Sequence, residues 1–173
     1  MEKGKTNYFP FSVFRFSSMF MPESLASKLD RWKFNIFPAY RGSGARVLYI
    51  ADDYREMRVK IPLSWRTRNY VGTIYGGSMY GGIDPIYMLM LIKTLGKDYV
   101  VWDKAAQIRF KRPGKETLFA DFLLTEAELD EIKTLLETRK SVDRIYNVEL
   151  KDKNGKVHCL IEKTLYIAKK GII

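Results

Sequence analysis

The chain has 173 residues, 46% of them hydrophobic, and a single cysteine, Cys159. This length suits one domain with a substantial core, and one cysteine excludes an intrachain disulfide framework and fits a reducing cytosol, so we expect a cytoplasmic protein. The formal net charge of +10 favours an acidic partner: nucleic acid, an anionic membrane surface or the phosphates of coenzyme A. The basic residues are scattered and no known nucleic-acid-binding motif accompanies them, so nucleic acid is not expected and the basic surface can simply be solvated.

The N-terminal 21 residues are rich in aromatic side chains but show no regular period. Arg15 and several serines interrupt the apolar part, so this segment is a poor signal peptide. It could pack on the domain, join a subunit interface or make a peripheral membrane contact. Packing or an interface is favoured, because an interfacial helix should show a clean basic face.

An amphipathic helix is predicted after Ser24, because four apolar residues recur at helical spacing: Leu25, Leu29, Trp32 and Ile36. Phe37-Pro38 should end this helix, and Gly42-Ser43-Gly44 is typical of a turn. We therefore predict an N-terminal helical extension over residues 1–43, followed by one domain over residues 44–169.

Alternation of apolar and polar residues then predicts strands over 46–52 and 54–63. A long strand is expected over 99–112, with Lys104 on its apolar face and Asp103 on its polar, solvated face. Further strands are expected over 117–124, 142–151 and 157–168. A capping box at Thr125 predicts a short helix to residue 139, and an Asn154-Gly155 turn joins the last two strands.

The stretch from Asn69 to Lys93 predicts a central helix. It opens with several glycines, carries one acid, Asp84, and continues as an apolar run over residues 86–92. A helix without a polar face is a buried helix, and this run is too short to span a bilayer. The rest of the chain should therefore wrap around it.

Several residues of this stretch resemble the signature of hotdog-fold acyl-CoA thioesterases of the phenylacetyl-CoA type: Asn69, Gly72-Thr73, Tyr75-Gly76-Gly77 and Asp84. Tyr75 stands where those enzymes usually carry histidine. The wider pattern is similar to an uncharacterised hotdog branch, domain of unknown function 4442, through Asn69, Asp84-Pro85, residues 101–104 and residues 110–114. The resemblance implies an α+β hotdog fold, in which a curved antiparallel sheet wraps a long central helix, and at least a homodimer.

Asp84 has two interpretations. As an acid beside an apolar helix it is partly desolvated, which raises its pKa and suits a general base or nucleophile that attacks a thioester. Alternatively, Asp84 is the N-cap of a helix whose first residue is Pro85. If Asp84 is the base, Asp84→Asn should slow hydrolysis about a hundredfold or more and leave stability unchanged or raised.

The resemblance implies that a backbone N–H of Gly76 or Gly77 polarises the thioester carbonyl at a helix N-terminus, although both glycines could serve only close packing. Asn69 and Tyr75 would position the carbonyl, unless Tyr75 is a packed tyrosine. The remaining candidates for contact with the acyl chain, Asp84 or coenzyme A are Thr73, Met79, Tyr80, Met88, Lys104, Arg66 and Arg68. A lysine at the sheet edge that reaches water is the alternative for Lys104.

The only histidine, His158, adjoins Cys159 on a predicted strand, where neighbours point to opposite faces, so a nucleophilic pair is not expected. No metal-ligand cluster is evident, and no cofactor is implied beyond coenzyme A within the substrate. The sequence thus predicts an acyl-CoA hydrolase that is a homodimer or tetramer. The alternatives are a non-catalytic acyl- or acyl-CoA-binding hotdog protein and, more weakly, a basic scaffold at a membrane or nucleic acid.

Overall fold

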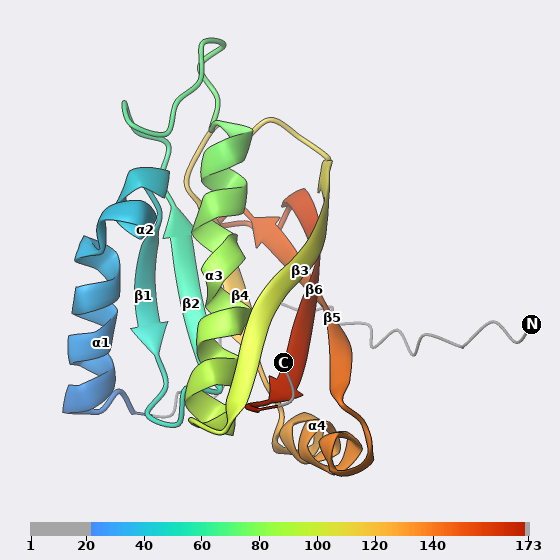
Figure 1. Cartoon of the computed structure of the whole chain (residues 1–173). Helices are drawn as coiled ribbons and strands as arrows, with labels where there is room; N and C mark the ends of the chain where they lie inside the picture. The colour runs from blue at the N-terminus through green and yellow to red at the C-terminus, as the bar shows by residue number, and fades with distance from the viewer. Residues whose placement is uncertain (1–21, 172–173) are drawn as a thin grey trace, which may run out of the picture.

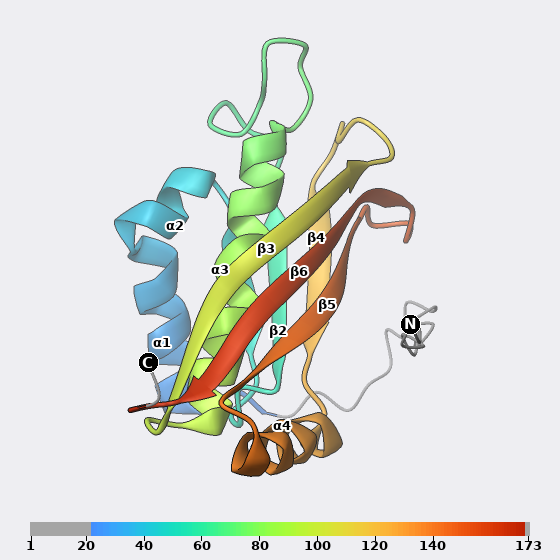
Figure 2. The same ribbon diagram turned by 45° about the vertical axis from the view of Figure 1, so that its right-hand side comes forward.

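A computed structural model describes residues 22–171, which form six strands and four helices. All strands pair antiparallel in one sheet of order β1-β2-β4-β5-β6-β3, and the sheet curves around helix α3 (Figures 1 and 2). The strands are β1 (Arg46–Ile50), β2 (Glu56–Ile61), β3 (Tyr99–Phe110), β4 (Leu118–Leu123), β5 (Ser141–Lys151) and β6 (Val157–Lys169). The helices are α1 (Leu25–Ile36), α2 (Pro38–Ser43), α3 (Gly76–Leu95) and α4 (Glu126–Thr138). This arrangement confirms the predicted α+β architecture.

Helix α3 begins at Gly76, so the interpretation of Asp84 as an N-cap is wrong. Pro85 lies inside the helix, where its ring meets the carbonyl of the residue four positions earlier. Helix α3 also packs closely on the sheet: a Cβ added to Gly82 would lie 2.6 Å from the Cβ of Ala45. Asp84 therefore sits about two turns inside a buried helix rather than at its end.

Helix α1 forms as predicted, but its apolar stripe faces outward. Leu25, Leu29, Trp32 and Ile36 are all exposed, whereas Ser27 is buried. The polar side of the helix faces the protein because the neighbouring strand uses it for hydrogen bonds. The Asn35 side chain donates to the Val47 carbonyl (2.9 Å) and accepts from the Val47 N–H (2.8 Å). The predictions for residues 1–21 lie outside the described residues.

The two edges of the sheet differ. Strand β1 is covered by helix α1 through the Asn35 contacts, and Glu23 accepts a hydrogen bond from the Ile50 N–H at 3.1 Å. Strand β3 forms the other edge, pairs only with β6 in the sheet order, and exposes residues 102–107 to solvent. An exposed edge strand presents backbone N–H and carbonyl groups to another chain.

The remaining predicted elements are confirmed. The Thr125 hydroxyl accepts from the Glu128 N–H at 3.2 Å and caps α4, and Gly155 adopts a positive φ of 80° in the turn between β5 and β6. Helix α2 was not predicted, and it ends at Gly44, whose φ is 79°. Within residues 22–171, none of the helices combines the length and apolar character needed to cross a membrane.

Candidate functional site

Asp84 forms an ion pair with a lysine that was not among the site residues predicted from the sequence. Lys163 on β6 reaches across the inner face of the sheet and forms an ion pair and hydrogen bond with the Asp84 carboxylate on α3. The Lys163 side chain is only 2% exposed, whereas the Asp84 side chain remains 36% exposed. Asp84 is thus anchored from inside the protein and still open to solvent on its other side.

Asp103 joins this cluster, although the sequence placed it on a solvated face. The register of β3 against β6 shifts between Asp103 and Ala105, which indicates a β-bulge. A bulge adds one residue to a strand and re-aims the side chains around it. Asp103 consequently lies opposite Leu165 on the inner face, and its carboxylate is 2.7 Å from the Lys163 ammonium. The alternation of side chains predicted for this strand is wrong at this point.

The electrostatics of the cluster follow from burial and from these contacts. Burial raises the pKa of Asp103, and hydrogen bonding and charge attraction to Lys163 oppose that rise. Burial alone would lower the pKa of Lys163, but the hydrogen bonds and charges of Asp103 and Asp84 outweigh it and raise the pKa. Lys163 is therefore an ammonium at neutral pH, and it faces two carboxyl groups. The Tyr80 hydroxyl, 3.3 Å from the ammonium, has a pKa raised by burial and by its hydrogen bond to Asp84.

The N-terminus of α3 presents its first backbone N–H groups without a side-chain cap. Tyr75 is the N-cap residue, and its side chain makes no capping hydrogen bond. The Tyr75 ring lies over the helix start, because a Cβ added to Gly77 would come within 2.3 Å of it. A Cβ added to Gly76 would lie 2.8 Å from the Phe110 ring, so close packing explains Gly76 independently of any chemistry. Uncapped N–H groups and the helix dipole together form a site for a polarised oxygen.

Asn69 and Thr73 form a hydrogen-bonded turn next to this helix end. The Asn69 side chain accepts from the Thr73 N–H at 2.9 Å and donates to the Thr73 hydroxyl at 3.0 Å. Both residues line a pocket of about 360 Å³ between the 62–75 loop and the end of β3. Gly76 and Met79 line it too, together with Ile74, Phe110, Lys111, Arg112, Pro113 and Gly114. The structure thus brings together four predicted site residues, while Asp84 lies outside this lining.

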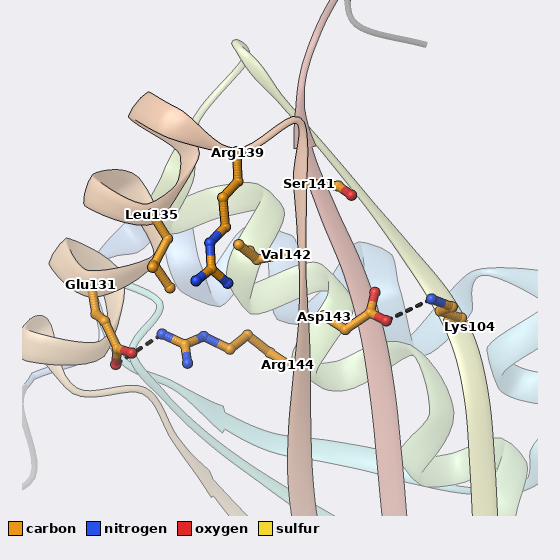
Figure 3. A pocket seen from close by; sticks show the side chains of 8 residues that line it. All are labelled: Lys104, Glu131, Leu135, Arg139, Ser141, Val142, Asp143 and Arg144. Carbon is orange, nitrogen blue, oxygen red and sulfur yellow. Dashed lines mark hydrogen bonds and ion pairs between the residues drawn. The ribbon is translucent and has the colours of Figure 1, made fainter. Parts of the chain in front are cut away.

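Lys104 lies on the opposite face of the sheet from Asp84. Its ammonium pairs with Asp143 at 2.5 Å, and both side chains are substantially exposed. The two residues line a more polar hollow of about 450 Å³ between α4, β3 and β5, with Glu131, Leu135, Arg139, Ser141, Val142 and Arg144 (Figure 3). The predicted pairing of Lys104 with Asp84 is wrong, because Lys104 points to the outer face of the sheet at the β-bulge. The lysine that pairs with Asp84 is Lys163.

The other candidates occupy separate positions. Arg66 and Arg68 are exposed on the 62–75 loop, which extends beyond the N-terminal end of α3 in both views, and Arg66 lies over the Trp65 ring at 5.6 Å (Figures 1 and 2). Met88 is partly buried against the core. Neither arginine lines the pocket beside Asn69.

His158 and Cys159 are both used structurally. The His158 ring is hydrogen-bonded to Asp152 (3.1 Å) and to the Pro113 carbonyl (3.0 Å). Burial raises the pKa of the Cys159 thiol to about 11, so it is not a thiolate nucleophile at neutral pH. Among residues 22–171 there is no group of three or more His, Cys, Asp or Glu side chains that could hold a metal ion.

The chain matches a known protein family over most of its length. DUF4442, described as a domain of unknown function, matches residues 29–167, and the chain therefore belongs to this family. No curated protein matches it.

Solved structures share the fold. A protein of unknown function from Pseudomonas aeruginosa, described as a probable thioesterase, superimposes with a TM-score of 0.73 at 19% identity over 87% of this chain and 99% of that one. A thioesterase from Haemophilus influenzae gives 0.62 at 14% identity over 87% and 96% of the two chains. A mutant thioesterase from P. aeruginosa gives 0.62 at 12% identity over 87% and 99%. At these identities the likeness establishes the hotdog fold.

Proposed function

Starting from a hotdog domain of the DUF4442 family, we propose that this protein hydrolyses acyl-CoA or a related acyl thioester. The observation that carries the proposal is the placement of Asp84: an acid inside a buried helix, anchored by Lys163 and 36% exposed on its free side. A carboxylate in this setting can accept a proton from water, or attack a thioester carbonyl directly.

The second component is the uncapped N-terminus of α3. When water adds to the thioester carbon, the carbonyl oxygen becomes an oxyanion, and backbone N–H groups of Gly76 and Gly77 would stabilise it. Asp84 takes the proton of the attacking water. Collapse of the tetrahedral intermediate breaks the carbon–sulfur bond, so that the carboxylic acid forms and the leaving thiolate takes the proton from Asp84, which returns the carboxylate to its starting state.

One chain cannot bring both components to the same carbonyl. Gly76 and Asp84 are eight residues apart on one helix, which at 1.5 Å per residue separates them by about 12 Å. Two copies related by a two-fold axis, with their α3 helices antiparallel, would place Asp84 of one copy beside the glycines of the other. The open edge at β3 supports this arrangement, because β3 adjoins α3 and carries Asp103 of the cluster. We therefore propose a homodimer as the active unit, alone or within a tetramer.

The pocket beside Asn69 is a suitable place for part of the substrate. Met79, Ile74 and Phe110 give it apolar walls, and its volume of about 360 Å³ accommodates a small acyl group. Lys111 and Arg112 at the same pocket are cations that could meet the phosphates of coenzyme A. We propose that the reaction needs no cofactor, because Asp84 and the backbone N–H groups suffice for it, and that it takes place in the cytoplasm.

Release of thiol from a panel of acyl-CoAs tests the proposal, with chain lengths from acetyl to palmitoyl and with aromatic acyl groups included. Turnover of at least one substrate, abolished in Asp84→Asn, is expected. Asp143→Asn is a matched control, because Asp143 also pairs with a lysine but lies on the opposite face of the sheet. Absence of turnover with every substrate contradicts the proposal.

Tyr75 favours a second candidate function, acyl-CoA binding without hydrolysis. Its ring covers Gly77, at the position where the resembling enzymes usually carry histidine, and it narrows access to the backbone N–H groups that would hold the oxyanion. This alternative predicts that acyl-CoA raises the melting temperature and is recovered intact. Equilibrium dialysis followed by mass spectrometry of the bound ligand separates it from hydrolysis.

A further inference from the structure

Lys163 occupies a position where a lysine is costly. The inward-facing residues of β6 are otherwise apolar or cysteine, namely Cys159, Ile161, Leu165 and Ile167, and Lys163 falls in the same alternation. An isolated ammonium taken out of water costs several kcal/mol. A lysine with a side chain 2% exposed must therefore be compensated by what surrounds it.

The cost of burying the Lys163 ammonium is offset by hydrogen bonds, because its three N–H donors have three oxygen acceptors nearby. Three oxygen acceptors lie close to the Lys163 nitrogen: a carboxylate oxygen of Asp84, a carboxylate oxygen of Asp103 at 2.7 Å, and the Tyr80 hydroxyl at 3.3 Å. These acceptors come from α3 and β3, so the lysine on β6 joins three elements. Tyr146, opposite Lys163 on β5, is buried.

The charges of the cluster do not cancel. Two carboxylates and one ammonium leave one negative charge, and Asp84 and Asp103 compete for the same cation. Asp103 belongs to the exposed edge strand, while Asp84 lies on the helix. The share of the ammonium that reaches Asp84 therefore depends on Asp103.

We propose that Lys163 is a positioning residue for Asp84, and that Asp103 limits how strongly it acts by sharing the ammonium. Lys163 fixes one carboxylate oxygen of Asp84 and leaves the other for the attacking water. Lys163 itself is too buried to touch a substrate. This inference rests on the proposed thioester hydrolysis for its kinetic test, and it has a second test that needs no turnover.

The alternative is a purely structural ion cluster. In that case, removing either partner would lower stability and the amount of active enzyme, and the pH dependence of turnover would stay where it is. A positioning role instead predicts opposite displacements of the pH–rate profile. Loss of the Lys163 cation removes the attraction that favours the charged carboxylates, whereas loss of the Asp103 charge leaves the whole ammonium to Asp84.

The kinetic experiment compares full-length wild type with Lys163→Met, Lys163→Arg and Asp103→Asn. In Lys163→Met, we expect kcat to fall at least tenfold at neutral pH with KM changed less than threefold, and the acidic limb of the pH profile of kcat to move to higher pH. In Asp103→Asn the limb should move down. Lys163→Arg keeps the positive charge, so the acidic limb of its pH profile should stay near that of wild type. Its kcat should still fall, because the guanidinium contacts Asp84 with a different geometry.

Lys104→Met is the matched control. Lys104 is also a lysine paired with an aspartate, but it lies on the outer face of the sheet, and its loss should leave kcat within twofold and the limb in place. Profiles of Lys163→Met and Asp103→Asn that superimpose on wild type, or move in the same direction, overturn the inference. If Lys163→Met does not fold by circular dichroism, the downward displacement in Asp103→Asn decides the question.

The second test follows the Asp103 carboxyl carbon by NMR during a pH titration of wild type, Lys163→Arg and Asp84→Asn. The charge of Asp84 raises the pKa of Asp103 and the Lys163 ammonium lowers it, so the midpoint should fall in Asp84→Asn and stay near that of wild type in Lys163→Arg. An unchanged midpoint in Asp84→Asn overturns the inference. If wild type hydrolyses no thioester, the proposed function fails while this titration still decides whether Asp84 and Asp103 share the Lys163 ammonium.

Discussion

Asp84→Asn is the substitution with the largest predicted consequence, because it changes one oxygen to nitrogen and little else in shape. Asparagine cannot take a proton from water, so hydrolysis should fall about a hundredfold or more, equivalent to about 2.7 kcal/mol of transition-state stabilisation. The substitution also changes the environment of Lys163. Its ammonium would keep Asp103 at 2.7 Å and Tyr80 at 3.3 Å but lose its second carboxylate.

Because Asp84 contacts Lys163, we expect Asp84→Asn to lower the stability of the protein, whereas the sequence alone predicted unchanged or higher stability. Considered alone, a desolvated acid predicts a neutral or stabilising effect of asparagine, whereas breaking a charged hydrogen bond to a buried lysine is destabilising. Asp84 is 36% exposed and one carboxylate partner remains, so we expect a loss of about 1–2 kcal/mol, below the full value for a buried pair. For a chain of this size that corresponds to a fall in Tm of about 2–8 °C.

The assay measures thiol release at saturating acyl-CoA and thermal unfolding of the same preparations. Asp143→Asn should leave both within experimental error of wild type, because its pair with Lys104 is exposed. A mutant Asp84→Asn that hydrolyses its best substrate within about threefold of wild type, a difference below about 0.7 kcal/mol, refutes the catalytic role. A mutant more stable than wild type refutes the inferred importance of the Lys163 contact.

Three further predictions concern the helix end, the sheet edge and the β5–β6 turn. Gly76→Ala must displace the half-exposed Phe110 ring, so Tm should fall by only a few degrees, while kcat falls at least tenfold. A fall in kcat no larger than the loss of stability explains would indicate that Gly76 serves packing and not catalysis. Ala106→Pro on the exposed edge of β3 should convert a dimer to a monomer by light scattering, because the Ala106 N–H faces away from β6 and proline removes it from the open edge, and an unchanged mass would place the interface elsewhere. Burial would raise the pKa of Asp152, but hydrogen bonds from His158 and two backbone N–H groups hold it below 3.8. The stabilisation is therefore present above pH 3.8 and lost as pH falls through the lower folded value; Asp152→Asn should cost about 1–3 kcal/mol in urea at pH 7 and much less near pH 2.5.

Local patterns were sufficient to predict the strands, the buried central helix and the capped α4 helix. They left Asp84 open between a helix cap and a base, because an Asp-Pro pair is typical of a helix start, whereas α3 continues through Pro85. They failed at Asp103, because a β-bulge reverses the side-chain alternation without any glycine or proline to mark it.

Lys163 could have been found from sequence. A lysine within an alternating apolar set, between Ile161 and Leu165, indicates a buried charge in need of a partner. That pattern does not say which carboxylate is the partner, because the contact spans 79 residues of chain to Asp84. The pairing depends on how the sheet curves around α3, which is a property of the whole fold.

The covering of strand β1 by helix α1 limits how far copies of this chain can assemble. A sheet with two open edges can grow without end, because each added copy presents a new edge. Among the residues that the structure describes, Asn35 occupies both backbone groups of Val47, so β3 is the edge left open to another chain. Two copies joined edge to edge through β3 would therefore close the sheet at both ends, and Asn35→Ala, which frees the backbone groups of Val47, would reopen the β1 edge.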